Sequence, residues 1–363
     1  MISTAACALL VFIGTNTPPN GASRGLYAVR LDARSGAFGP VELAAETHDP
    51  GFLAWHPNEK ILYALGQGPG LDGKLSGGAV AFSLERATEK LTRLNAAGAG
   101  GAGTTHLATD ATGRALVVVS YGGGTVASFP LGPDGALQPR ASLHAPTGPL
   151  GPMPTRQEKP HPHSVTLSPD NRFAYVCDLG LDAILVYALD AATATLTPAG
   201  QFATAPGAGP RHSKISDDGR FLYALNELSA TIETFSRDLS SGALARVQTI
   251  ATLPDDFEDP NTSAEIRLHP NGRFLYASNR GHDSIAVFSR DAATGRLSLL
   301  EHVPSGGGHP RNFALSPAGD WLVCANRDSD NLVSFRVDSV TGRLIATGHS
   351  ARVPQAICVL FAR

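Results

Sequence analysis

The chain lacks most of the features that mark metal, nucleic-acid or membrane proteins. Its 363 residues include four cysteines, with no CxxC or CxxxH spacing, which argues against a sulfur-bound metal. The formal net charge is −3 and no Lys/Arg cluster is present, so neither nucleic acid nor a membrane is an expected partner. The cysteines lie in or beside apolar runs, typical of free thiols in a reducing compartment, and we expect a cytoplasmic location. They are Cys7, Cys177, Cys324 and Cys358.

The beginning of the chain, "MISTAACALLVFIGTN", is apolar but has no basic segment before the apolar run. The run is also too short to cross a bilayer. We interpret it as a β-strand rather than a signal peptide.

A repeat dominates the rest of the chain. A Pro/Asp/Asn/Gly turn followed by an apolar run occurs at 56–67, 110–121, 168–179, 216–227, 269–280 and 316–327, as in "HPNGRFLYASNR". Neighbouring copies therefore begin 47 to 58 residues apart, and further short apolar runs follow each of them. Four short strands per repeat are typical of a propeller blade.

The two chain ends together predict one more blade. "CALLVFIGTN" matches the second strand of the repeat, but no first strand precedes it, whereas "VPQAICVLF" at 353–361 aligns with the first strand "HPRNFALSP". Pairing the two ends would remove an open sheet edge. We therefore predict an all-β chain, a single domain over 1–363, with seven four-stranded antiparallel blades closed by the C-terminal strand.

Two positions of the repeat do not follow the repeated pattern. In an antiparallel blade the start of the first strand and the end of the second lie together, and both positions vary here among His, Arg, Glu and small residues. Such variation on a symmetric scaffold is typical of a functional site. The charged residues at these positions are His163, Arg211, Glu227, Arg280, Arg311 and Arg327.

The motifs "HPHS", "GPRH", "YALNEL", "YASNRG" and "GGGHPRNFALSP" resemble the seven-bladed β-propeller lactonases. This family includes bacterial 6-phosphogluconolactonases and fungal carboxy-cis,cis-muconate lactonizing enzymes. The resemblance implies a catalytic quartet of His163, Arg211, Glu227 and Arg280. Glu265 and Asn279 look like neighbours in the same mouth of the central channel. Arg311 and Arg327 are expected to line the channel or attract an anion, and Asp178 to orient other groups. We count these five as candidate substrate-binding residues.

The residue types fit lactone hydrolysis without a cofactor. Two guanidiniums can hold the oxyanion and an anionic group of the substrate, and either Glu227 or His163 can activate water. His161 and His163 would point the same way from an extended strand, but no carboxylate cluster accompanies them, so we predict no metal. The expected substrate is a small lactone with an anionic group, most simply 6-phosphogluconolactone, and the expected assembly is a monomer or weak homodimer.

Three other interpretations stay open from the sequence. Arg211 and Glu227 can be a structural ion pair, and His163 can simply bind a loop carbonyl. The same groups can serve a lactone-forming cycloisomerase of the muconate type, or the propeller can be a noncatalytic interaction platform. The long Pro/Gly-rich stretch at 144–162 enters directly at His163, so we expect a rim or lid over the site.

Overall fold

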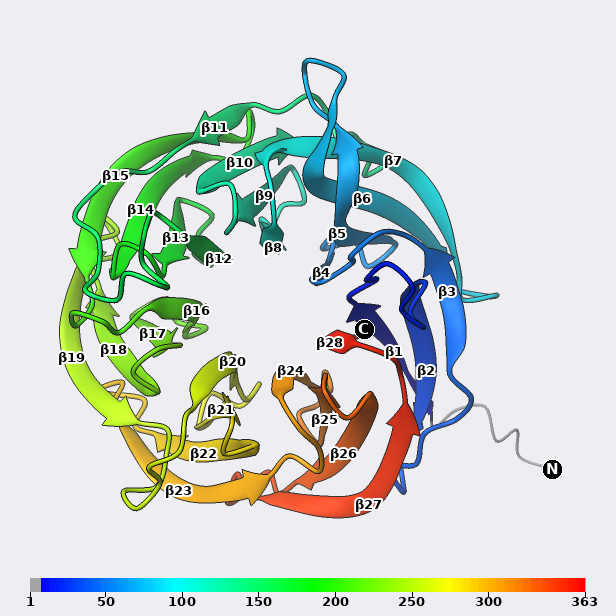
Figure 1. The fold of residues 1–363 in the computed structure, drawn as a ribbon, viewed down its shortest axis with the longest axis vertical. Coiled ribbons are helices and arrows are strands. Elements are labelled where there is room, and N and C mark those ends of the chain that lie inside the picture. The colour runs from blue at the N-terminus through cyan, green and yellow to red at the C-terminus, as the bar shows by residue number, and fades with distance from the viewer. Residues whose placement is uncertain (1–7, 363) are drawn as a thin grey trace. The chain divides into compact units, whose positions relative to one another are not determined.

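The computed structural model describes residues 8–362, and every named strand belongs to one of seven four-stranded antiparallel sheets. These sheets are the seven predicted blades (Figure 1). Residues 8–362 contain no helix with the length and apolar character needed to cross a membrane. Contacts divide the chain into two compact units, a first unit of Met1–Pro50 with Thr252–Arg363 and a second unit of Gly51–Ala251. That 1–363 form a single domain stays a prediction.

The second unit holds four sheets, and each runs consecutively along the chain. Their strands are β4 (Leu53–Trp55), β5 (Ile61–Pro69), β6 (Leu75–Glu85) and β7 (Lys90–Gly101); β8 (Thr104–Thr109), β9 (Ala115–Ser120), β10 (Thr125–Pro130) and β11 (Ser142–His144); β12 (Pro162–Leu167), β13 (Phe173–Asp178), β14 (Ala183–Asp190) and β15 (Thr195–Ala203); and β16 (Pro210–Ile215), β17 (Phe221–Asn226), β18 (Thr231–Arg237) and β19 (Leu244–Ala251).

The first unit holds three sheets, one of which joins the two chain ends. Their strands are β28 (Ala356–Phe361), β1 (Ala8–Thr15), β2 (Gly25–Asp32) and β3 (Glu42–Glu46); β20 (Thr262–Leu268), β21 (Phe274–Arg280), β22 (Ser284–Arg290) and β23 (Leu297–Pro304); and β24 (Pro310–Leu315), β25 (Trp321–Asn326), β26 (Asn331–Val337) and β27 (Leu344–Arg352).

The predicted closure by the C-terminal strand is confirmed. β28 pairs antiparallel with β1, with Val11 opposite Phe361 and Ile13 opposite Val359, and Figure 1 shows red β28 beside dark blue β1. Val11, Val359 and Phe361 also share one buried cluster with the neighbouring sheet β24–β27. Closure therefore supplies both a hydrogen-bonded edge and part of an apolar core.

Five of the seven second strands, β9, β13, β17, β21 and β25, are buried along their whole length, as expected where sheets pack on both of their faces. β13 "FAYVCD" and β17 "FLYALN" have no exposed residue, and residues of both lie in one buried cluster between their two sheets. This explains why these strands read as continuous apolar runs instead of alternating with polar residues.

A recurring tyrosine links each of three sheets to the following sheet, at the turn between its third and fourth strands. The hydroxyls of Tyr63, Tyr175 and Tyr276 donate to the carbonyls of Gly135, Gly242 and Gly342, at 2.7, 2.9 and 2.9 Å. Gly242 has φ 75°, and a Cβ there would lie 2.7 Å from the Phe173 ring. The repeated Tyr and Gly are thus explained by a buried hydroxyl and a turn that only glycine fits.

Three of the four cysteines are confirmed as buried free thiols, namely Cys177, Cys324 and Cys358. Burial raises the pKa of the Cys177 thiol to about 11, so it stays protonated and unreactive at neutral pH. Cys7 lies outside the described residues.

Candidate functional site

The site residues of the first strands lie at β-bulges. In β12, Pro162 pairs with Asp178 and Ser164 pairs with Cys177, so His163 is the extra residue between them. Arg211 occupies the same place in β16, between Pro210 and His212. A bulge breaks the strict alternation of a strand and redirects one side chain. The bulge therefore frees the residue at the first of the two variable positions from the alternation of its strand.

For Glu227 and Leu179 the second variable position follows directly after the second strand. The N–H of Glu227 donates to Gly209 O at 2.8 Å, and the N–H of Leu179 donates to His161 O at 3.0 Å. Each bond ties the end of the second strand to the residue just before the bulged strand begins. The prediction that these two positions of one blade meet is therefore confirmed for Arg211 and Glu227.

Arg211 and Glu227 form a buried ion pair. Arg211 Nε donates to Glu227 Oε2 at 2.9 Å, and the side chains are only 3% and 5% exposed. Nη1 of Arg211 also lies 3.1 Å from Nε2 of His212. Contacts on two sides hold the guanidinium in one orientation, as expected where an arginine positions a charged group.

His163 completes this group of side chains. Its Nε2 lies 3.9 Å from Glu227 Oε2, and its side chain is 6% exposed. Its ring packs edge-on against Tyr121 and His212, with centroid distances of 5.5 and 5.3 Å. The second unit thus brings His163, Arg211 and Glu227 together, three of the four residues that the family resemblance implies.

Arg156 is a member of the site that sequence reasoning missed. Its Nη2 forms an ion pair with Glu227 Oε1, and its side chain is 35% exposed. Burial lowers the pKa of Arg156, but the hydrogen bond and charge of Glu227, with a contribution from Tyr121, outweigh it, so the pKa is raised overall. The signal available in the sequence is a cation in the 144–162 stretch, which the sequence predicts to be a rim or lid over the site without pointing to Arg156.

The segment that carries Arg156 is firmly held. The amide of Gln157, which is 1% exposed, donates to Leu179 O at 2.8 Å and to Asp182 Oδ1 at 2.7 Å. Gly180 packs so closely that a Cβ there would lie 1.8 Å from Lys159 O. The 144–162 segment is therefore a fixed rim, at least from 156 to 159.

Asp178 contacts the main chain of this rim. Its Oδ1 accepts from the N–H groups of His161 and Leu181, at 2.8 and 3.1 Å. Burial raises its pKa to about 6, although these hydrogen bonds act in the opposite direction. These contacts are those of an orienting group, and a substrate-binding role for Asp178 stays a prediction.

His161, which was considered with His163 as a metal pair, uses both ring nitrogens in other contacts. Nδ1 lies 2.9 Å from Tyr121 O and Nε2 lies 3.0 Å from Glu158 Oε1. The ring stacks on Tyr121 with a centroid distance of 4.1 Å. Over residues 8–362, no three His, Cys, Asp or Glu side chains are grouped so that they could hold a metal ion.

The other predicted site residues lie in the first unit. Glu265 is fully buried, accepts a hydrogen bond from Asn312 and lies 3.4 Å from Arg267 Nε. Asn279 Oδ1 accepts from Ser263 and Thr252. These contacts hold Glu265 and Asn279 within their own unit.

Three arginines of the first unit affect the charge state of His309. Burial and the charges of Arg280, Arg327 and Arg311 lower the pKa of His309 to about 4, against the opposing charge of Asp328. Arg280 Nη2 donates to Ser263 O at 2.9 Å, and Arg327 Nε donates to Asp328 Oδ1 at 2.8 Å. His309 stays neutral at pH 7, and the arginines supply the local positive charge.

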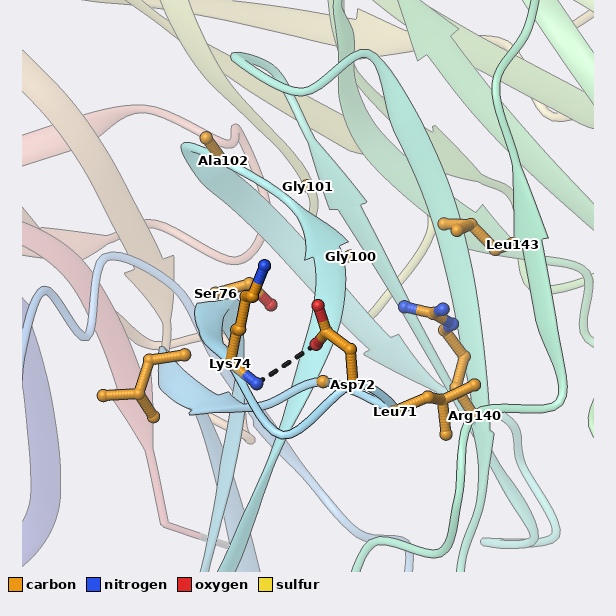
Figure 2. A pocket seen from close by; sticks show the side chains of 11 residues that line it. Leu71, Asp72, Lys74, Ser76, Gly100, Gly101, Ala102, Arg140 and Leu143 are labelled. Carbon is orange, nitrogen blue, oxygen red and sulfur yellow. Dashed lines mark hydrogen bonds between the residues drawn. The ribbon is translucent and has the colours of Figure 1, made fainter.

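A pocket of about 440 Å³ in the second unit contains none of the predicted site residues. Figure 2 shows Arg140, Leu71 and Asp72 at its wall, and the Lys74 N–H donates to Asp72 Oδ1 at 3.1 Å. We do not assign the chemistry to this pocket because its lining contains none of the four residues that the family resemblance implies.

Comparison with known proteins now decides the family. The family model described as "Lactonase, 7-bladed beta-propeller" matches residues 10–361. The chain belongs to this family. Membership confirms the predicted family, the fold class and the enzyme class, a lactonase.

Relatives of this lactonase are similar along most of their length. A 6-phosphogluconolactonase of Bacillus subtilis (strain 168) is 35% identical over 302 residues, which are 83% of each chain. A 6-phosphogluconolactonase of Formosa agariphila is 31% identical over 312 residues, 84% of this chain and 86% of the relative. The solved structure of the periplasmic gluconolactonase of Pseudomonas aeruginosa is 30% identical with a TM-score of 0.90, covering 98% of this chain and 99% of that one.

Proposed function

We propose that this lactonase hydrolyses 6-phosphogluconolactone at the site around Glu227. The names of the Bacillus and Formosa relatives support the substrate. The observation that carries the proposal is that Glu227 accepts hydrogen bonds from two guanidiniums, those of Arg156 and Arg211, beside the imidazole of His163. Together these side chains provide a base and positive charge at one buried place.

The reaction needs a base and a stabilised oxyanion. Water attacks the lactone carbonyl carbon and loses a proton to the base, and the carbonyl oxygen becomes an oxyanion. The ring C–O bond then breaks, and the ring oxygen takes up a proton to become a hydroxyl. Arg211 is the fixed cation for the oxyanion or the substrate carbonyl.

Glu227 and His163 share the proton handling in this proposal. We assign Glu227 as the base and His163 as the group that holds the water or returns the proton to the ring oxygen. The separation of 3.9 Å between His163 Nε2 and Glu227 Oε2 is longer than a hydrogen bond, so one water can contact both atoms. The reverse assignment, with His163 as base and Glu227 orienting Arg211, uses the same atoms.

The resemblance assigns Arg280 as the second guanidinium of the reaction, and we retain it as a proposed contact to the substrate. Arg311 and Arg327 are proposed to attract an anion together with Arg280, because the charges of all three lower the pKa of His309. Glu265 and Asn279 are proposed to support this group from within their sheet.

The test is to measure the hydrolysis of a panel of lactones through the protons that the reaction releases. 6-Phosphogluconolactone, glucono-δ-lactone and a muconolactone are offered to the purified protein at equal concentration, and the rate above spontaneous hydrolysis is measured. We expect the phosphorylated lactone to give the highest kcat/KM. Turnover of the muconolactone alone would favour the cycloisomerase alternative, and no turnover of any lactone by a folded protein would contradict the proposed function.

A further inference from the structure

We propose that Arg156 is a specificity-determining residue whose guanidinium exchanges partners. It leaves Glu227 and binds the anionic group of the substrate instead. This inference rests on the proposed function and adds a coupling to it. Binding of the anion draws the guanidinium away from Glu227 Oε1, and the freed oxygen can then accept a proton from water. An uncharged lactone cannot recruit Arg156 in this way.

The two guanidiniums on Glu227 differ in their freedom to move. Arg211 is 3% exposed and is held on a second side by His212, whereas the Arg156 side chain is 35% exposed, with Tyr121 as its further partner. A buried guanidinium with contacts on two sides cannot reorient without losing them. Arg156 is therefore the one of the two that can turn toward an incoming ligand.

The backbone of Arg156 is fixed, so the exchange requires only side-chain rotation. Its N–H donates to Met153 O at 3.0 Å, and the next residue, Gln157, is buried and bonded to Leu179 and Asp182. Rotamer changes of an exposed side chain are fast. The guanidinium can thus rotate while the backbone of residue 156 stays in place, and no loop has to open.

Charge favours the exchange when the ligand is a phosphate. A phosphate monoester carries up to two negative charges and three acceptor oxygens, and arginine binds it in a bidentate manner. Glu227 still keeps the Arg211 hydrogen bond after Arg156 leaves, so the buried carboxylate retains one cationic partner. The other cation of this rim, Lys159, donates to Gly122 O at 2.7 Å, away from Glu227.

The experiment compares Arg156→Ala and Arg156→Lys with Lys159→Met as a matched control that removes a rim cation without touching Glu227. kcat and KM are measured for 6-phosphogluconolactone and glucono-δ-lactone. Arg156→Ala should raise KM for the phosphorylated lactone about 10- to 100-fold, the worth of a hydrogen bond between charged groups. It should raise kcat/KM for glucono-δ-lactone rather than lower it, because Glu227 Oε1 is then free without an anion to draw the guanidinium away, and Arg156→Lys should recover part of the phosphate effect.

A merely structural Arg156 would lower kcat/KM equally for both lactones, and this outcome would overturn the proposal. A second readout does not depend on turnover: titration calorimetry of 6-phosphogluconate with wild type, Arg156→Ala and Lys159→Met. We expect weakened binding in Arg156→Ala alone. If wild type hydrolyses neither lactone but only Arg156→Ala binds 6-phosphogluconate more weakly, the proposed function fails while anion binding by Arg156 stands. Equal binding of 6-phosphogluconate by all three proteins would contradict the exchange, whatever the activity.

Discussion

Nε of Arg211 lies 2.9 Å from Oε2 of Glu227, and neither side chain is more than 5% exposed. One residue is a bulge in β16 and the other follows β17, so a single sheet fixes both. Removing one partner of such a pair takes a hydrogen-bonded counter-charge away from the other buried side chain. For variants of Arg211 or Glu227, the free energy of unfolding must therefore be measured as well as the reaction rate.

Glu227→Gln should lower kcat by about 10² to 10⁴, the usual worth of a general base. The amide also replaces a charged acceptor of two guanidiniums, so we expect unfolding to become easier by about 1.5 to 3 kcal/mol. Rates are measured well below the melting temperature of the variant, with Glu158→Gln, a half-exposed carboxylate of the rim, as control. If Glu227→Gln keeps more than about a third of wild-type activity, Glu227 is a structural partner of the arginines.

His163→Asn separates the two assignments of the base. If Glu227 is the base, the variant should lose about tenfold in kcat and keep the acidic limb of its pH profile. If His163 is the base, the loss should reach about 10² or more, and the limb should disappear. The measurement is kcat/KM from pH 5 to 9 on the best lactone of the panel. An unchanged rate and profile would remove His163 from the chemistry.

Asp178→Asn should stabilise the protein at neutral pH. The folded pKa of about 6 lies above the ordinary value of 3.8, so the folded state binds the proton more tightly and the free energy of unfolding falls as pH rises between these values. Two pKa units correspond to about 3 kcal/mol, which is the upper bound on the increase in the free energy of unfolding that Asp178→Asn can give at pH 7. Chemical denaturation at pH 4.5 and 7.5 checks this; a variant with the pH slope of wild type would contradict it.

Deletion of residues 353–363 should strongly destabilise the chain. It removes β28 and exposes β1 as an open edge, together with the contacts of Val359 and Phe361 in the buried cluster. Two such side chains contribute about 3 to 6 kcal/mol, so the melting temperature should fall by roughly 10 °C or more. A truncated chain that melts cooperatively within about two degrees of the full chain would show that closure is unimportant.

Exhaustive chelation should leave turnover unchanged. The proposed chemistry uses the side chains of Glu227, His163 and Arg211, and His161 already uses both ring nitrogens in contacts within the protein. Initial rates are compared before and after treatment with a strong chelator, followed by addition of calcium, magnesium or zinc. Activity that is lost and then restored by one of these ions would assign the Lewis acid role to a metal.

The sequence alone determined the sheets and three residues of the candidate site. Turn residues and apolar runs recur because each blade solves the same packing problem, so the repeat predicts β12–β13 and β16–β17 together with the pairing of β28 and β1. Departures from that repeat marked His163, Arg211 and Glu227, because a functional site need not obey the symmetry of its scaffold.

Only the tertiary structure decided how these residues are partnered. Arg156 lies 71 residues before Glu227 in an irregular segment with no repeat to place it, so no periodicity could bring the two together. The orienting contacts of Asp178 and the contacts of His161 likewise depend on how the 144–162 segment folds back over β13. Local patterns specify strands through short-range geometry, whereas the partners of a charged side chain in a loop are set by long-range packing.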